Sequence, residues 1–219
     1  MLTVEIWSDI VCPWCYLGKR RWEDALARFP HADEVTTLWR SFELRPKQPS
    51  VPGDSLEEMM RRDGHTREEL DEIFQWIGGL GKDVGIELRP REYRPVNSFD
   101  AHRLLYLALD HGLVHAMKDR LLRAYHSELL NIADHDVLRR LADEAGLPAA
   151  DVAEVLAGDR YADRVRGDED RASGIKVTSV PSFVVDGREA VHGMVDSDAM
   201  LAMLHREWER HTATAVTDR

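Results

Sequence analysis

The chain has 219 residues, of which 43% are hydrophobic and 32% charged, a balance typical of a soluble protein with a sizeable core. We therefore expect one domain, or one domain with an insertion. The formal net charge is −11 and the basic residues are scattered among acids, which makes nucleic acids and anionic membranes poor partners. The opening MLTVEIWSD lacks a basic leader, and no run of about 18 apolar residues occurs, so a cytoplasmic protein is expected.

The first elements predict a βαβ unit. The stretch LTVEIW (2–7) is rich in β-branched and aromatic residues and predicts a strand, and the segment CPWC follows after a short loop. Pro13 suits the first turn of a helix, because its missing N–H is no loss there, and apolar residues continue at helical spacing to Phe29. A second strand is expected over VTTLWRSFEL (35–44). Strands joined through a helix should be parallel, with a right-handed crossover.

The pattern becomes helical after the proline-rich loop RPKQPSVPG (45–53). Ser55 with Glu58, and Thr66 with Glu69, each match a capping box, in which the two side chains bond each other's backbone N–H groups at a helix start. Two helices are therefore expected to begin at these positions.

Further helices are predicted in the same block. Pro148 should begin one near residues 149–156, since proline fits the first turn. Apolar residues spaced by four predict another helix, along Leu113, Met117, Leu121, Tyr125 and Leu129.

Strand signals resume only in SFVVDGREAVHG (182–193). Asp186-Gly187 lies between two apolar runs there and predicts a tight antiparallel hairpin. A last amphipathic helix should begin near Asp196, with a frayed tail after His211. The expected order is thus βαβ, a large helical block, then ββα.

The two cysteines, Cys12 and Cys15, form a single CxxC motif. Cytoplasmic thiols are kept reduced, so a bond between them would be transient and catalytic. A thiolate is the attacking species, and the start of a helix favours negative charge, so Cys12 is the expected nucleophile. Cys15, one turn further on, would resolve the mixed disulfide. Trp14 would offer an exposed apolar surface beside the reactive sulfur.

Two other uses of these cysteines were weighed. Two thiolates at this spacing bind one edge of a zinc ion, but a second ligand pair is missing, and His111 and His115 straddle Gly112 and suit solvated helix ends. Buried cysteines also act as inert core residues. Neither alternative explains why both thiols lie at a helix start.

The late stretch VTSVPSFVVDG (177–187) places a proline just before a predicted strand, where proline is unusual. Together with CPWC after the first strand, this motif resembles the thioredoxin superfamily, whose cis-proline loop faces the CxxC. The long helical insertion resembles the DsbA-like group, and VEIWSDIVCPWCYLGKRR, WRSFELRP, AHRLL and GIKVTSVPSFVVDG look like its FrnE-like branch. The resemblance implies an α/β thioredoxin fold with a mixed central sheet, formed by 1–53 and 175–219, and an all-helical insertion over 54–174.

The resemblance also implies roles for particular residues. The Val180–Pro181 bond should be cis, and the backbone of Val180 should pair with an extended substrate beside Cys12. Pro13 and Trp14 would contact that substrate. Glu5 resembles the acid that accepts a proton from the buried cysteine, although an exposed strand glutamate is an equal alternative.

The insertion offers two more candidates for substrate contact. Asn97 and His102 lie at the start of a predicted helix that would face the site. A helix cap or an internally satisfied polar group is the more common use of such residues.

A thiol–disulfide oxidoreductase acting on protein or small-molecule thiols is therefore predicted, without a tightly bound cofactor. The architecture also resembles kappa-class glutathione transferases and hydroxychromene-carboxylate isomerases, so a glutathione-dependent isomerase or transferase acting on an aromatic small molecule is the alternative. Those families typically carry serine where this chain has Cys12, which weakens the isomerase hypothesis but leaves glutathione open as a redox partner or cosubstrate. A non-enzymatic holdase is a third hypothesis, and a homodimer is left open.

Overall fold

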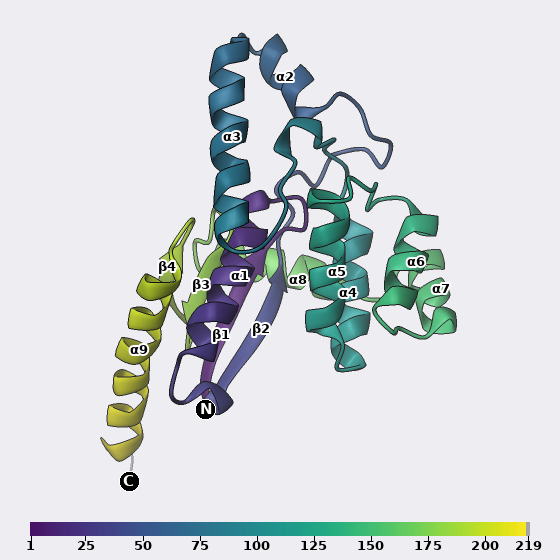
Figure 1. Cartoon of the computed structure of the whole chain (residues 1–219). Helices are drawn as coiled ribbons and strands as arrows, with labels where there is room; N and C mark the ends of the chain where they lie inside the picture. The colour runs from purple at the N-terminus through teal and green to yellow at the C-terminus, as the bar shows by residue number, and fades with distance from the viewer. Residues whose placement is uncertain (218–219) are drawn as a thin grey trace.

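The computed structural model describes residues 1–217, whose strands form one sheet in the order β2-β1-β3-β4 (Figure 1). β1 runs parallel to β2 and antiparallel to β3, and β3 runs antiparallel to β4. The parallel βαβ unit and the late hairpin are thus confirmed. The strands are β1 (Leu2–Ser8), β2 (Val35–Ser41), β3 (Ser182–Val185) and β4 (Arg188–His192).

Helices cover the sheet and form a block beside it. Figure 1 shows α4 to α7 grouped beside the sheet and α3 standing above the start of α1. The helices are α1 (Pro13–Ala27), α2 (Leu56–Arg62), α3 (Arg67–Asp83), α4 (Phe99–Asp110), α5 (Val114–His126), α6 (His135–Glu144), α7 (Ala149–Ala157), α8 (Ala162–Gly174) and α9 (Ser197–Thr217), with short 3₁₀ turns at Ala32–Glu34 and Pro90–Glu92. This is the expected α/β thioredoxin fold with a helical insertion.

The alternation of side chains along β1 divides the core between the two faces of the sheet. Leu2, Val4 and Ile6 pack in one cluster with residues of α1 and α9. Trp7 points to the other face and packs with Ala172 of α8. The insertion predicted over 54–174 therefore includes a helix, α8, that closes the second face of the sheet.

Local signals in the sequence correspond to observed elements. Ser55 and Thr66 cap α2 and α3 through complete capping boxes. Asp186 and Gly187 both adopt positive φ, at 45° and 77°, as a tight hairpin turn requires. The helix predicted after Pro148 begins at Ala149, as expected.

Three predicted boundaries are wrong, and one observed helix, α8, is not expected from the sequence. β2 ends at Ser41, because residues 42–44 leave the ladder and the Leu44 N–H donates to Asp9 Oδ2 at 2.7 Å. α5 ends at His126, so Leu129, with a φ of 58°, lies outside it. α8 has no strong apolar period and was not predicted. The expected fraying after His211 is replaced by a helix that continues to Thr217.

A glycine permits the closest approach between α1 and the loop before β3. The Val180–Pro181 bond is cis, and Pro181 lies against Gly18. A Cβ added to Gly18 would lie 2.9 Å from Pro181 Cγ, inside normal contact distance. The missing side chain of Gly18 therefore sets how near Pro181 comes to α1.

Gly18→Ala should lower the free energy of unfolding by about 1–3 kcal/mol, because the added methyl group overpacks a fixed proline ring. Gly79→Ala in α3 is the matched control, since a Cβ there meets nothing within 4 Å. The control should be neutral or more stable by about 0.5–1 kcal/mol, the usual advantage of alanine in a helix. Urea denaturation measures both, and equal effects at the two sites would contradict the contact.

Candidate redox site

Cys12 is the N-cap residue of α1 and Pro13 occupies the first helical position. The Cys12 carbonyl accepts from the N–H groups of Cys15 and Tyr16, at 3.1 and 3.4 Å. The first turn thus begins immediately after Cys12, and its unpaired N–H groups and helix dipole favour negative charge at this end. Proline is accommodated because its position needs no donor.

The Cys12 thiol faces the cis-proline loop. Its Sγ lies 3.8 Å from the carbonyl oxygen of Val180, to which it donates a weak hydrogen bond. Both cysteines are reduced and buried, with exposed fractions of 2% for Cys12 and 1% for Cys15. The structure thus brings Cys12, Cys15 and Val180 into one cluster, beside Pro181.

Cys15 lies one turn deeper, under the loop between β1 and α1. Its Sγ accepts the backbone N–H of Asp9 at 3.4 Å. Burial raises the pKa of the Cys15 thiol well above its usual range, and the nearby Cys12 sulfur adds to the rise. The Asp9 N–H and the positive charge of Lys118 act in the opposite direction. Cys15 is therefore held as a thiol in the reduced protein.

Three side chains of the helical block hold the loop that precedes Cys12. Lys118 Nζ donates to Ser8 Oγ at 2.6 Å, and His102 Nε2 lies 3.3 Å from Asp9 Oδ1. His126 Nε2 lies 2.9 Å from the Ile10 carbonyl oxygen, and since burial lowers the pKa of His126 to about 3, its ring is neutral and donates. The loop of residues 8–10 thus depends on α4 and α5.

A cavity of about 190 Å³ opens beside Cys12. Trp14 forms one wall and stacks obliquely on Trp76 of α3, with ring centroids 5.6 Å apart. Trp14 is half-buried by this contact, so the apolar surface expected of it is shared with Trp76, which is exposed. The other lining residues are Val11, Cys12, Pro13, Leu44, Arg45, Leu56, Tyr93, Pro95 and Tyr125.

Glu5 is placed differently from either expectation. It is buried, and its carboxylate binds Arg40 and Arg171, each with one contact of 2.6 Å. This ion pair joins β1 to β2 and α8. The described contacts of Cys15 involve Asp9 instead of Glu5.

Asn97 and His102 have structural contacts. The Asn97 side chain accepts the N–H of Phe99 at 2.9 Å and donates to Glu43 and the Pro46 carbonyl, both at 3.2 Å. It thereby fixes the chain on either side of Leu44 and Arg45 in the cavity wall. His102 is fully buried and its side chain contacts Asp9, so it supports the segment that precedes Cys12.

Among the side chains that the structure describes, no group of three or more His, Cys, Asp or Glu is placed to hold a metal ion. Among the described residues, no helix combines the length and apolar character needed to cross a bilayer.

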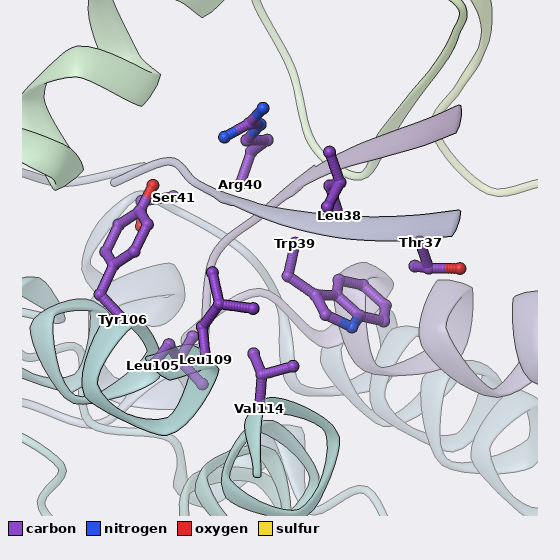
Figure 2. A pocket seen from close by; sticks show the side chains of 9 residues that line it. All are labelled: Thr37, Leu38, Trp39, Arg40, Ser41, Leu105, Tyr106, Leu109 and Val114. Atoms are coloured by element: carbon purple, nitrogen blue, oxygen red, sulfur yellow. The ribbon is translucent and has the colours of Figure 1, made fainter. Parts of the chain in front are cut away.

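A separate, smaller cavity has a volume of about 30 Å³. Figure 2 shows Trp39 of β2 and Val114 of α5 lining this cavity between the sheet and the helices. Neither cysteine lines it.

The model of the DsbA-like thioredoxin domain matches residues 3–205. The chain belongs to this family. Among DsbA-like proteins, it is similar to the probable DsbA oxidoreductase SCO1869 of Streptomyces coelicolor, with 37% identity, a TM-score of 0.90 and coverage of 95% of this chain and 91% of that one. It is 28% identical over 200 residues to the uncharacterized protein YwbO of Bacillus subtilis, covering 89% of this chain and 92% of YwbO.

More distant solved structures share the fold. A 2-hydroxychromene-2-carboxylate isomerase is 16% identical with a TM-score of 0.69, covering 99% of both chains. The cytosolic disulfide reductase DsbM of Pseudomonas aeruginosa, in its structure with GSH, is 20% identical with a TM-score of 0.57, covering 98% of this chain and 99% of that one. The FrnE-like branch stays a prediction.

Several buried residues of this DsbA-like site escape prediction from the sequence. Ser8 and Asp9 lie in the segment before CPWC and read there as ordinary loop residues. Lys118 carries a detectable signal, since it follows Met117 and lies four residues after Val114, on the face of α5 that should be apolar. A lysine on the apolar face of a predicted helix indicates a buried charged group that has a specific role.

Asp9→Asn should lower the free energy of unfolding by about 1–3 kcal/mol near neutral pH, the cost of weakening a buried hydrogen-bonded group. Burial alone raises the pKa of Asp9, but His102, the Leu44 N–H and Ser98 outweigh it, so the net shift is downward. A carboxyl with a lowered native pKa stabilises the fold above its unfolded pKa of about 3.9, and this stability is lost as pH falls through the native value. The difference in free energy of unfolding between the wild type and Asp9→Asn should therefore shrink below about pH 4.

Asp151→Asn is the matched control for that titration. Asp151 pairs with His111 at 2.9 Å, but both side chains are about a third exposed. An exposed pair contributes about 1 kcal/mol at most, so the control should cost less at every pH. Denaturant midpoints across pH measure both variants, and a pH-independent Asp9→Asn effect would contradict the ionised Asp9.

Proposed function

We propose that this DsbA-like protein is a thiol–disulfide oxidoreductase that uses the Cys12–Cys15 dithiol. The observation that carries the proposal is the position of Cys12, at the start of α1 and facing the Val180 carbonyl. Cys15 lies one helical turn behind it in the same buried cluster. An inert pair of cysteines would need neither the helix start nor the facing proline loop.

The exchange takes two steps. The Cys12 thiolate attacks one sulfur of a substrate disulfide, the substrate S–S bond breaks, and the first substrate thiolate leaves. Cys15, as its thiolate, then attacks Cys12 Sγ, which forms the Cys12–Cys15 bond and releases the second substrate thiolate. The protein loses two electrons and the substrate gains them, and the reverse sequence oxidises a dithiol.

Backbone and apolar contacts would orient the substrate. The backbone of Val180, two residues before β3, would pair with an extended chain placed beside Cys12. Pro13, Trp14 and the half-exposed Leu44 offer apolar contact around the reactive sulfur. Such a surface accepts cysteine-containing peptides as well as small thiols.

We include glutathione as a redox partner in the proposal. The cavity beside Cys12 has room for part of a small thiol, and Arg45 in its wall is a cation that suits a carboxylate. The distant neighbour DsbM has been crystallised with GSH. A reducing compartment, as expected from the sequence, would maintain the protein as the dithiol.

Cys15→Ser should convert turnover into a trapped intermediate. With a model disulfide such as oxidised glutathione, the variant should accumulate a mixed disulfide on Cys12, seen as a mass increase of one glutathionyl group, because the resolving thiol is missing. Cys12→Ser is the control and should form no adduct. Catalysed reduction of the disulfide should be lost in both variants.

The same variants distinguish the alternative functions. A glutathione-dependent isomerase or transferase would retain its activity in Cys15→Ser, because it needs one positioned thiol only. A holdase would suppress client aggregation with both cysteines replaced. Unchanged disulfide-exchange turnover in Cys15→Ser would overturn the proposed function.

A further inference from the structure

Lys118 is a fully buried lysine beneath the redox site. It lies on α5, has an exposed fraction of 0%, and its Nζ donates to Ser8 Oγ at 2.6 Å. The same Nζ lies 4.7 Å from the centre of the Trp39 ring, a cation–π contact. Among the described side chains, no carboxylate lies in salt-bridge range of Lys118.

A buried ammonium group without an anionic partner is costly, because a hydroxyl and an aromatic ring replace only part of its hydration. Burial accordingly lowers the pKa of Lys118 to about 8. An apolar side chain of similar length would fill the same space at lower cost. The cost of burying this ammonium group therefore indicates that Lys118 has a role other than stabilising the fold.

The Cys15 thiol of the redox site is one of the groups that respond to the Lys118 charge. Lys118 holds Ser8, and the next residue, Asp9, donates its N–H to Cys15 Sγ, so the lysine and the thiol lie on either side of one short segment. A Cys15 thiolate raises the pKa of Lys118, and the Lys118 charge lowers that of Cys15. Each group favours the charged form of the other.

Other charged groups around Lys118 do not replace this pairing. Asp9, in the loop before α1, raises the pKa of Lys118, but its carboxylate is already bound by His102 and the Leu44 N–H. Lys19 of α1 lowers the pKa of Lys118 by repulsion, as a like charge does. On α5 itself, His115 has its own pKa lowered by burial and by the charges of Lys19 and Lys118.

We propose that Lys118 is a positioning residue for the resolving cysteine, whose ammonium group stabilises the Cys15 thiolate while it attacks the mixed disulfide on Cys12. This inference rests on the proposed function. It names the group that favours ionisation of Cys15, which the second step of the exchange requires. A buried thiol of raised pKa is a poor nucleophile until it is ionised, and a fixed positive charge in a low-dielectric site is an effective way to ionise it.

The step balances without any further reactant. The Cys15 thiol gives its proton to solvent, and the resulting thiolate donates an electron pair to Cys12 Sγ. The Cys12–Cys15 bond forms as the bond between Cys12 and the substrate sulfur breaks. The departing substrate thiolate takes a proton from solvent, and Lys118 keeps its own proton throughout.

The test is the pH dependence of the resolving step in Lys118→Met, which keeps the chain length and removes the charge. The protein is mixed with excess oxidised glutathione, and the decay of the Cys12–glutathione adduct is followed by acid quenching and mass spectrometry. In the wild type the decay rate should rise with pH as Cys15 ionises, and this rise is the alkaline limb of the pH profile. Loss of the Lys118 charge should move the alkaline limb to a pH about one to two units higher, the usual effect of one nearby opposite charge. At pH 7 the decay should slow by roughly 10- to 100-fold.

Two controls separate this role from a structural one. Lys19→Met makes the same chemical change at another buried lysine, which is paired with Glu23 and Asp119, and should leave the alkaline limb in place. The rate of adduct formation at Cys12, measured in a Cys15→Ala background, should not change when Lys118→Met is added. A general disturbance of the fold would slow both steps.

A second measurement holds even if Lys118→Met does not fold. Side-chain NMR of lysines labelled with ¹³C at Cε gives the Lys118 pKa, which should be higher by more than half a unit in Cys15→Asp than in Cys15→Ala, because a carboxylate at this position carries the negative charge of a Cys15 thiolate and the coupling is reciprocal. An unchanged pH dependence of adduct decay in Lys118→Met, or equal Lys118 pKa values in Cys15→Asp and Cys15→Ala, would overturn the inference. Failure of the wild type to resolve its adduct would instead overturn the proposed function.

Discussion

Ser8 is the last residue of β1, and the buried residues that follow it lie outside any helix or strand and must find other hydrogen-bond partners. Here they come from His102, Lys118 and His126, on α4 and α5, which bind Asp9, Ser8 and the Ile10 carbonyl in turn. The helical insertion is therefore part of the redox site, because it fixes the segment that leads into Cys12 and donates to Cys15.

The buried charges of the molecule form two networks with different consequences. On one face of the sheet, Glu5 binds Arg40 and Arg171, and Asp168 of α8 accepts the Ser41 N–H at 2.7 Å. This network joins α8 to the strands and neutralises the glutamate that otherwise resembles a proton acceptor. Under the CxxC, by contrast, Asp9 is bound by His102, and no described carboxylate forms a salt bridge with Lys118. The electrostatic environment of Cys15 is thus set from the insertion.

The sequence predicts those parts of the fold that local chemistry determines. Pro13 at a helix start, the capping boxes of Ser55 and Thr66, and the Asp186-Gly187 turn each specify a geometry within a few residues, and all are observed. The helix α8 is not predictable in this way, because it is held by ion pairs and a few small contacts to the sheet. The same limit applies to the site: the two cysteines are visible as a motif, whereas Asp9 and Lys118 act through contacts that only the folded chain brings together.

The central claim is that Cys12 and Cys15 exchange between dithiol and disulfide. Its most direct test is the equilibrium of the wild-type protein with glutathione redox buffers, followed by tryptophan fluorescence, since Trp14 adjoins both cysteines, and checked by thiol labelling. The account predicts one reversible two-electron transition, whose midpoint gives the direction of electron flow. A protein that forms no intramolecular disulfide at any buffer composition would contradict it.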